Sequence, residues 1–567
     1  MPDIVLATFN AKFIHASFGL RCLRANLGEL RERSALAEFT IGERPLDVAE
    51  RILALEPRIV ALGVYVWNVV PTTELVALLK RLRPELIVIL GGPEVSHEVE
   101  TQPVVGLADC TIRGEGERAL ASICREVLAG QPVPAKVVDG LKPDLEKTVL
   151  PYDEYTDADI AHRLIYVEAS RGCPFSCEFC LSSLDDGVRQ YPLGPFLAAM
   201  ERLLARGVRH FKFVDRTFNL HLPTSRRILE FFLARMAGAE AGATPIADCS
   251  PPTVLGQRYA GLFLHFEMVP DRLPPELREL LARFPAGSLQ LEVGIQSFDP
   301  AVTAAIDRRQ DLAKMEDNFR FLRGHTQAHV HADLIVGLPG ETAAGFGAGF
   351  DRLVALGPQE IQVGLLKKLR GAPIARHDAP EAMLYSPAPP YEILRNRLID
   401  FPTMQRLRRF ARYWDLVGNS GNFVETLPLF WRGAASAGGA VVAAQLTRNG
   451  ADGAALSSGG PGELGAVASP FAEFLHFCDW FHAREGRHHA LALSRTMERV
   501  FEFLVAERRL APAEVAASLF RDCRRIGYLE VPAAVRPHVA PRSLAELAAR
   551  RGASTRNTQR QGRHRAE

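Results

Sequence analysis

The chain lacks an excess of charge of either sign and a long apolar run, and each absence excludes a class of protein. Its 567 residues carry 67 basic and 66 acidic side chains, so no global field draws it to nucleic acid or to an anionic membrane. No stretch reaches the roughly 18 uninterrupted apolar residues of a membrane helix, and MPDIVLATFN is unlike a signal peptide. We expect a cytoplasmic protein that binds neither DNA nor membrane and acts on a small-molecule or peptide substrate.

The cysteines lack the pairing of a disulfide framework. Nine is an odd number, and Cys173, Cys177 and Cys180 fall close together while the other six are scattered. We expect the scattered six to be small buried side chains: Cys22, Cys110, Cys124, Cys249, Cys478 and Cys523.

The apolar pattern divides the chain into segments, as its length requires. Residues 1–135 alternate apolar runs with amphipathic stretches, which predicts a Rossmann-like, doubly wound α/β domain with five parallel strands. Ligands of such a sheet bind beyond the carboxyl ends of its strands, here residues 10–19, 65–68, 91–96 and 113–117. Residues 136–160 contain proline, are acidic and lack periodicity, which predicts a linker.

The alternation of strands and helices resumes in residues 161–375. Six predicted parallel strands would form a partial (β/α)6 barrel, with active-site residues at the carboxyl ends of its strands. Residues 376–545 are mainly helical, with a Gly/Ala/Ser-rich insertion at 433–466 that we expect to be flexible. The basic residues 546–567 predict a disordered tail.

The segment YVEASRGCPFSCEFCLSS follows an apolar strand and spaces its cysteines three and then two residues apart. Three thiolates fill three of the four ligand positions of a 4Fe-4S cluster and leave one iron open to a molecule that carries an amine and a carboxylate. A structural zinc site is the alternative, but it needs a fourth ligand, and no second pair lies nearby. We predict Cys173, Cys177 and Cys180 as metal ligands and as catalytic residues.

This spacing, with the aromatic Phe179 before the third cysteine, resembles the radical S-adenosylmethionine (SAM) superfamily. The resemblance implies a 4Fe-4S cluster and SAM as cofactors, and reductive cleavage of SAM as the reaction. It also implies that Phe179 lies near the adenine of SAM. Packing within the loop is the alternative for this ring.

Charged side chains at the ends of apolar strands mark further candidates, because burying a charge is costly unless it is paired. Asp215, Glu267, Glu292 and Asp333 stand in such places, and strand alternation puts Gln296 on the same face as Glu292. LEVGIQS and DLIVGLPGET resemble the later strands of a radical SAM subgroup, which implies that these five residues face SAM. Salt bridges to covering helices are the alternative for Glu267 and Asp333.

The first domain lacks the Gly-x-Gly-x-x-Gly of a dinucleotide site and has NAKFIHASFG after its first strand, which argues against NAD or FAD. A doubly wound domain before a radical SAM core, with GGPEVS and RGEGE after its fourth and fifth strands, resembles the cobalamin-binding arrangement. The resemblance implies cobalamin as a cofactor and the following contacts for it: Tyr65, Trp67, Asn68, Gly91, Gly92, Glu94, Gly114 and Glu115. For Tyr65, Trp67 and Asn68 the alternative is that they are plain residues at the end of the sheet.

One departure concerns the cobalt's lower ligand. The Asp-x-His-x-x-Gly segment is missing, and the domain has only His15 and His97, so we expect no histidine below the cobalt. The whole layout resembles a bacterial branch of cobalamin-binding radical SAM proteins with a helical C-terminal domain of its own.

The resemblance favours a transferase. An electron from a partner such as flavodoxin or ferredoxin would enter the cluster, SAM would be cleaved, and cobalamin would deliver a methyl group to the substrate. A radical SAM enzyme without cobalamin, such as a methylthiotransferase, is an alternative that would need a second cysteine triplet in the first domain. A non-catalytic iron-sulfur module is another.

Overall fold

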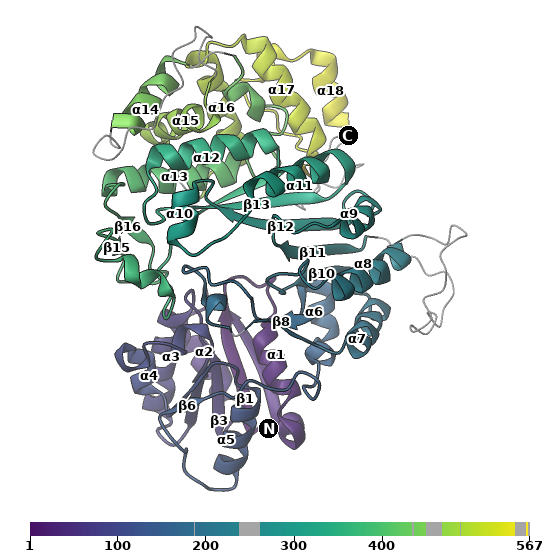
Figure 1. Cartoon of the computed structure of the whole chain (residues 1–567), viewed down its shortest axis with the longest axis vertical. Helices are drawn as coiled ribbons and strands as arrows, with labels where there is room; N and C mark the ends of the chain where they lie inside the picture. The colour runs from purple at the N-terminus through teal and green to yellow at the C-terminus, as the bar shows by residue number, and fades with distance from the viewer. Residues whose placement is uncertain are drawn as a thin grey trace.

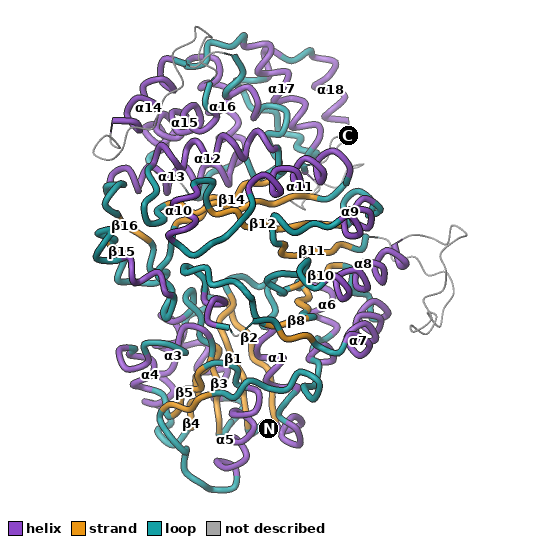
Figure 2. The backbone as a smooth tube through the Cα atoms, viewed as in Figure 1, coloured by secondary structure: helices purple, strands orange, loops and turns teal. Residues whose placement is uncertain are grey.

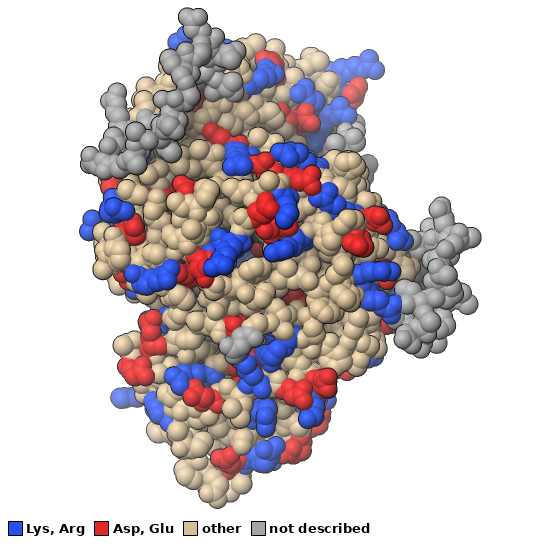
Figure 3. All heavy atoms as spheres, in the orientation of Figure 1, with Lys and Arg blue, Asp and Glu red and all other residues tan. Residues whose placement is uncertain are grey.

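The computed structural model describes residues 1–185, 187–236, 261–433, 436–448, 468–487, 489–549 and 563–564. Figure 1 shows an N-terminal sheet with its helices, a second sheet in the middle and a group of C-terminal helices beyond it. The predicted α/β class is confirmed. Among the described residues, no helix is long and apolar enough to span a bilayer. On the face shown in Figure 3, acidic and basic side chains are interspersed.

The N-terminal sheet is parallel, in the order β2-β1-β3-β4-β5-β6. All seven residues of β1 are buried, as expected for a strand with helices on both faces. Helices α2, α3 and α4 cover one face of the sheet, and α1 and α5 cover the other. The elements are β1 Ile4–Asn10, α1 Phe18–Ala25, β2 Ser34–Thr40, α2 Pro45–Leu53, β3 Ile59–Gly63, α3 Val69–Leu82, β4 Ile87–Gly91, α4 Pro103–Leu107, β5 Cys110–Arg113, α5 Glu117–Leu128 and β6 Val137–Asp139.

The sheet has one strand more than the five predicted, and it comes from the predicted linker at 136–160. β6 pairs with β5, with Val137 opposite Thr111. The same stretch forms a short 3-10 helix, Pro151–Glu154, and α6, Asp157–His162, which Thr156 begins with a capping box. Three residues are too few to show a period of two, so only the pairing partner reveals β6 as a strand.

The central sheet is the predicted six-stranded partial barrel, in the order β14-β13-β12-β11-β10-β7 with every pair parallel. A short hairpin, β8 Ser170–Arg171 with β9 Arg189–Gln190, flanks the cysteine loop. The barrel elements are β7 Ile165–Val167, α7 Leu193–Ala205, β10 His210–Phe213, α8 Leu222–Met236, β11 Phe263–Met268, α9 Pro275–Ala282, β12 Leu289–Gln296, α10 Pro300–Ala305, α11 Leu312–His325, β13 His329–Val336, α12 Ala343–Leu356 and β14 Glu360–Leu365.

The C-terminal region is helical, as predicted, and Figure 2 shows its helices packed beside the strands of the barrel. One apolar core runs from the barrel into these helices, where Phe350 of α12 meets Phe410 and Trp414 edge to face. The elements are the hairpin β15 Leu384–Tyr385 and β16 Ile393–Arg395, then α13 Phe401–Val417, α14 Ala437–Arg448, α15 Pro470–Glu485, α16 Leu493–Ala506, α17 Pro512–Arg525 and α18 Pro541–Ala549.

Part of the predicted flexible insertion at 433–466 is a helix. α14 begins where Ser436 donates its N–H and its hydroxyl to the fully buried carboxylate of Glu473 on α15. Small residues allow α14 to pack closely against α15. A Gly/Ala/Ser-rich composition alone does not predict this packing. Residues 449–466 lie outside the described part of the chain. In the predicted tail at 546–567, α18 continues to Ala549, and beyond it the structure describes only Arg563 and His564.

Candidate active site

A cavity of about 170 Å³, here called the barrel pocket, lies at the carboxyl ends of β11, β12 and β13. The loop that follows β8 closes one side of it and brings the three clustered cysteines to its wall. Thiols, acids and guanidinium groups share the lining, which includes Cys173, Cys177, Phe179, Cys180, Arg216, Glu267, Glu292, Gln296, Arg308 and Asp333.

The cysteine loop is held by hydrogen bonds to a distant segment, residues 306–307. Glu178 donates its N–H to the carbonyl oxygen of Ile306 at 3.1 Å, and the Ser176 hydroxyl donates to Asp307. Within the loop, Cys180 N–H donates to the Cys177 carbonyl at 3.0 Å. The three thiols thus have fixed positions around one cavity.

The arrangement fits a cluster better than a single ion. Every described cysteine is a free thiol, and among the described residues no three His, Cys, Asp or Glu side chains converge on one ion. In a 4Fe-4S cluster each thiolate binds its own iron, so the sulfurs need to surround a cavity rather than meet at a point. The three cysteines of the barrel pocket meet this condition.

Two acids of the barrel pocket have cationic neighbours. Glu292 Oε2 lies 2.8 Å from His265 Nε2 and 3.7 Å from Lys212 Nζ. Burial alone would raise the pKa of Glu292, but the hydrogen bond from His265 and the Lys212 charge outweigh it and lower the pKa. Glu267 lies 3.2 Å from Arg216, yet burial still raises the pKa of this carboxyl. One carboxylate is therefore firmly ionised and the other gains a proton more readily.

Asp333 is the third acid that lines the barrel pocket with Glu267 and Glu292. Its Oδ1 atom is 3.3 Å from His331 Nε2, but neither atom has a hydrogen bond among the described residues. Burial raises the pKa of Asp333, although His331 opposes this effect. Buried polar atoms without partners are expected where a ligand supplies the missing contact.

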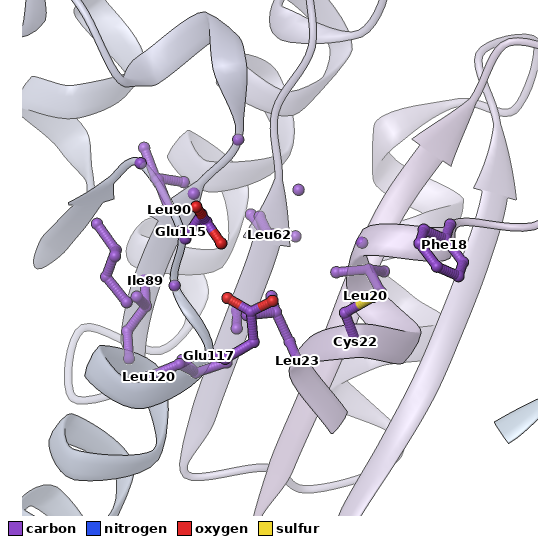
Figure 4. Close-up of a pocket in the computed structure, with 18 of the residues that line it drawn as sticks. Phe18, Leu20, Cys22, Leu23, Leu62, Ile89, Leu90, Glu115, Glu117 and Leu120 are labelled. Carbon is purple, nitrogen blue, oxygen red and sulfur yellow. The ribbon is translucent and has the colours of Figure 1, made fainter. Parts of the chain in front are cut away.

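A second cavity of about 270 Å³, the N-terminal pocket, lies between α1, α5 and the carboxyl ends of β3, β4 and β5. Figure 4 shows Leu23 of α1 opposite Glu117 of α5, with strand residues behind them. Its walls are mostly apolar: Phe18, Leu20, Cys22, Leu23, Leu62, Ile89, Leu90, Ile112 and Leu120.

Glycines shape the mouth of the N-terminal pocket. Gly92 and Gly114 have φ values of 111° and 74°, which disfavour larger residues. A Cβ atom at Gly92 would also lie 2.5 Å from the Val64 carbonyl oxygen. The turns after β4 and β5 therefore depend on glycine, at Gly92 because the chain passes close to Val64 and at both positions because of the backbone conformation.

A largely buried ion-pair network joins the N-terminal domain to β8, the strand that leads into the cysteine loop. Arg171 of β8 donates to Glu115 at 2.8 Å, to Glu117 at 2.6 Å and to Glu168 at 2.9 Å. Glu168 and Arg171 line the N-terminal pocket, and Cys173 of the barrel pocket follows two residues after Arg171. The cysteine loop is thus anchored on the N-terminal domain.

Known families match both pocket-bearing regions. The model of the B12 binding domain matches residues 4–124, and that of the Radical SAM superfamily matches residues 167–350. The chain contains a B12-binding domain and a radical SAM domain. A third model, for a protein of unknown function (DUF4080), matches residues 382–437, at the start of the helical region.

Relatives of this radical SAM protein include two methyltransferases. It is 27% identical over 355 residues to the cobalamin-dependent radical SAM methyltransferase TokK of Streptomyces tokunonensis. It is 25% identical over 357 residues to the 2-(S-pantetheinyl)-carbapenam-3-carboxylate methyltransferase of Streptantibioticus cattleyicolor. Each match covers 56% of this chain and 48% of the relative, so the chain spans about half the length of the curated relatives it matches.

The whole fold has a solved counterpart. The cobalamin-dependent SAM radical enzyme OxsB, solved with aqua-cobalamin bound, superposes with a TM-score of 0.55 at 12% sequence identity. The match covers 97% of this chain and 84% of OxsB, so it includes the helical C-terminal region. At this identity the likeness shows a shared fold.

The radical SAM domain brings most of the predicted SAM-side residues to one cavity. Phe179, Glu267, Glu292, Gln296 and Asp333 all line the barrel pocket with the cysteines. Asp215 does not: it is buried beneath the strand ends, where it accepts from Ala169 N–H at 3.1 Å and from the Ser170 hydroxyl at 2.6 Å. Burial raises the pKa of this acid to about 7.

The predicted cobalamin contacts divide into two groups. Tyr65, Gly91, Gly92, Gly114 and Glu115 line the N-terminal pocket, although Glu115 is already paired with Arg171 and Arg189. The other three have different surroundings, because Trp67 is exposed and stacks on Tyr65, Asn68 ties the Tyr65 turn to β1, and Glu94 accepts from Arg370 and Tyr391.

The two histidines of the first domain do not line the N-terminal pocket, and the barrel pocket contains two arginines that were not predicted. None of the residues lining the N-terminal pocket is a histidine, and His15 instead contacts Tyr166 of the barrel at 2.6 Å. Arg216 and Arg308 line the barrel pocket but were not singled out by sequence reasoning. Arg216 directly follows the predicted Asp215, a signal that could have identified it, whereas Arg308 follows α10 in an irregular stretch that offers no such signal.

Proposed function

We propose that this chain is a cobalamin-dependent radical SAM methyltransferase. In it, Cys173, Cys177 and Cys180 hold a 4Fe-4S cluster, the barrel pocket binds SAM and the N-terminal pocket binds cobalamin. The observation that carries the proposal is the presence of two pockets of different chemistry, thiol-lined and apolar, joined through Arg171. A non-catalytic iron-sulfur module would have no use for either the ionisable strand ends or the second pocket.

Side chains of the barrel pocket match the groups of SAM. When bound, the cluster supplies one electron to the sulfonium, and cobalamin carries the methyl group. Glu267, Glu292 and Asp333 offer acceptors for the amine and the ribose hydroxyls, while Arg216 and Arg308 offer donors for the carboxylate. Because these groups are fixed on strand ends and on anchored loops, they hold SAM in one orientation beside the cysteines. Phe179 gives an apolar surface for the adenine.

The N-terminal pocket would hold cobalamin by shape rather than by charge. Its leucines and isoleucines form an apolar wall, and Gly91, Gly92 and Gly114 let the backbone approach the ligand. Tyr65 and Trp67, stacked at 4.5 Å, would pack against the corrin. None of the described residues that line this pocket is a histidine, so packing rather than an imidazole would hold the cofactor here.

We propose a small molecule or a peptide as the substrate, and a low-potential carrier such as flavodoxin or ferredoxin as the electron donor. The methyltransferase relatives support the reaction class. Free thiols at all eight described cysteines favour a reducing compartment, the cytoplasm.

Cofactor content and SAM turnover test the proposal. Protein purified and reconstituted without oxygen should contain iron, sulfide and cobalt, and should release 5′-deoxyadenosine from SAM when a low-potential reductant is added. Zinc in place of iron would refute the cluster, and a loaded protein that binds SAM without cleaving it would refute the enzyme. If the protein does not bind added hydroxocobalamin, the result would favour a radical SAM enzyme without cobalamin.

A further inference from the structure

One guanidinium in the barrel pocket contacts both a cysteine and the strand beside it. Arg308 Nη1 donates to Cys177 Sγ at 3.4 Å, and Nη2 donates to the carbonyl oxygen of Gly294 in β12. Nε donates to Gln310 Oε1 at 3.3 Å. All three nitrogens have a partner, so the planar group is held in one orientation.

The contacts on the strand side of Arg308 are themselves anchored. Gln310 Nε2 donates to the carbonyl oxygens of Ile295 at 3.3 Å and of Ser297 at 3.0 Å, at the carboxyl end of β12. Arg308 N–H also donates to the Thr303 carbonyl at 2.8 Å. On the strand side, the guanidinium is therefore held by the backbone of β12, directly through Gly294 and indirectly through the anchored amide of Gln310.

An irregularity of β12 creates the space that the Arg308 side chain occupies. The pairing of β12 with β13 shifts register between Gly294 and Gln296, and Gln296 has a φ of 72°. Such a bulge interrupts the ladder and re-aims the groups around it. A Cβ atom at position 294 would lie 2.5 Å from Gln296 Nε2 and 3.6 Å from Arg308 Nη2, so glycine keeps this space open.

The cysteine loop is attached to the same segment at consecutive residues. Ser176 donates to Asp307, Cys177 accepts from Arg308, and Glu178 N–H donates to the Ile306 carbonyl. Of these contacts, only the one from Arg308 brings a positive charge to a sulfur that would bind iron.

We infer that Arg308 is a positioning residue that raises the reduction potential of the cluster on Cys177 and keeps the cysteine loop in register with β12. The inference rests on the proposed function. One-electron reduction adds one negative charge beside the guanidinium, takes that electron from the low-potential donor, and moves no proton and breaks no bond. A fixed cation and an N–H···S hydrogen bond both favour the reduced form.

The test compares Arg308→Gln with Arg309→Gln in the anaerobically reconstituted full chain. Arg309 is the matched control, because the same charge is removed from a side chain that also borders the barrel pocket but is 94% exposed and faces Asp307. Iron and sulfide are counted first, and reduction is then titrated without SAM and followed by electron paramagnetic resonance. We expect Arg308→Gln to shift the equilibrium about tenfold against the reduced form, about 59 mV for one electron, and Arg309→Gln to shift it far less.

Each outcome decides the inference. A complete cluster with an unshifted potential in Arg308→Gln would overturn it, as would an equal shift in Arg309→Gln. If Arg308→Gln loses its iron, Arg308→Lys is titrated instead, because it keeps the charge and loses the fork. A smaller shift in the same direction then supports the inference, and no shift overturns it. Wild-type protein without iron refutes the proposed function itself, so the two failures are distinguishable.

Discussion

The N-terminal pocket and the barrel pocket lie on the same kind of sheet but differ in what lines them. The first has walls of leucine and isoleucine, and Glu115 and Glu117 at its edge are already paired with Arg171. The second combines thiols, acids and guanidiniums, and leaves Asp333 Oδ1 without a hydrogen bond among the described residues. The fold thus decides where a ligand binds, and the side chains decide which ligand.

Because their linings differ, we expect each pocket to bind its ligand independently of the other, although Arg171 links them. A variant in one pocket should leave the ligand of the other in place. A variant in the network between them should weaken both.

Removing a cysteine should have the largest effect and should be confined to the barrel pocket. In Cys177→Ala we expect iron content and 5′-deoxyadenosine release to fall to background, because an iron loses its ligand. Binding of hydroxocobalamin, followed by absorbance, should be unchanged. Cys523→Ala, a buried cysteine on α17, is the control and should keep both cofactors. Loss of cobalamin binding in Cys177→Ala would contradict the independence of the two pockets.

Removing the guanidinium between the pockets should destabilise the protein most. Arg171→Met leaves Glu117 and Glu168 without their cation and Glu115 with Arg189 alone, and breaking a buried pair in this way costs about 3–5 kcal/mol. The free energy of unfolding in urea measures it. Arg113→Met breaks the exposed pair with Asp139 and should cost under about 1 kcal/mol. Equal costs for the two variants would show that the network is not what joins the domains.

Filling the N-terminal pocket should weaken cobalamin alone. Cys22 of α1 lines the cavity, so the larger ring in Cys22→Phe takes space that the ligand needs. We expect at least about tenfold weaker binding of hydroxocobalamin, about 1.4 kcal/mol, with normal iron content. Cys22→Ala leaves the cavity open and should bind as the wild type does. Tight binding by Cys22→Phe would place cobalamin elsewhere.

The pH dependence of stability should reveal a buried acid that follows β13. Glu341 accepts from the Ser297 hydroxyl at 2.5 Å, and burial raises its pKa from 4.5 to about 8. Because the folded state keeps this proton longer, its stabilisation is complete below pH 4.5 and is lost as the pH rises to about 8.

Glu341→Gln tests this expectation, since glutamine cannot titrate. The difference in unfolding free energy between wild type and variant should change by at most about 1.4 kcal/mol per pH unit in that window. Melting curves at several pH values measure it, and Glu56→Gln, a substitution on the surface, is the control. Parallel profiles for wild type and Glu341→Gln would mean that Glu341 is ionised in the folded protein.

Much of the fold could be predicted because strands buried on both faces are continuous apolar runs. All five strands expected in residues 1–135 and all six expected in the barrel are present. The failures have physical reasons. β6 is too short to show a period. α14 is rich in small residues, and its helix depends on packing against α15 and on the Glu473 carboxylate.

The candidate site also contains residues whose meeting could be predicted and a residue whose contact could not. Residues on alternate positions of parallel strands, such as Glu267, Glu292 and Asp333, meet at one sheet edge, so their meeting in one pocket could be expected. Arg308 follows α10 in an irregular stretch, and nothing in the spacing of a loop says which distant strand it will contact.

The amino-acid sequence by itself determined the cysteine spacing, the order of strands and helices, and the carboxyl edges where ligands bind, because these depend on neighbours along the chain. The tertiary structure alone decided which charges are paired and which remain for a ligand. In the folded chain Arg171 pairs with Glu115 and Glu117, and Arg308 contacts Cys177. Asp215 bonds to Ser170 and does not line the barrel pocket. Such pairings depend on how loops far apart in the chain fold over a sheet edge, and no local pattern records that.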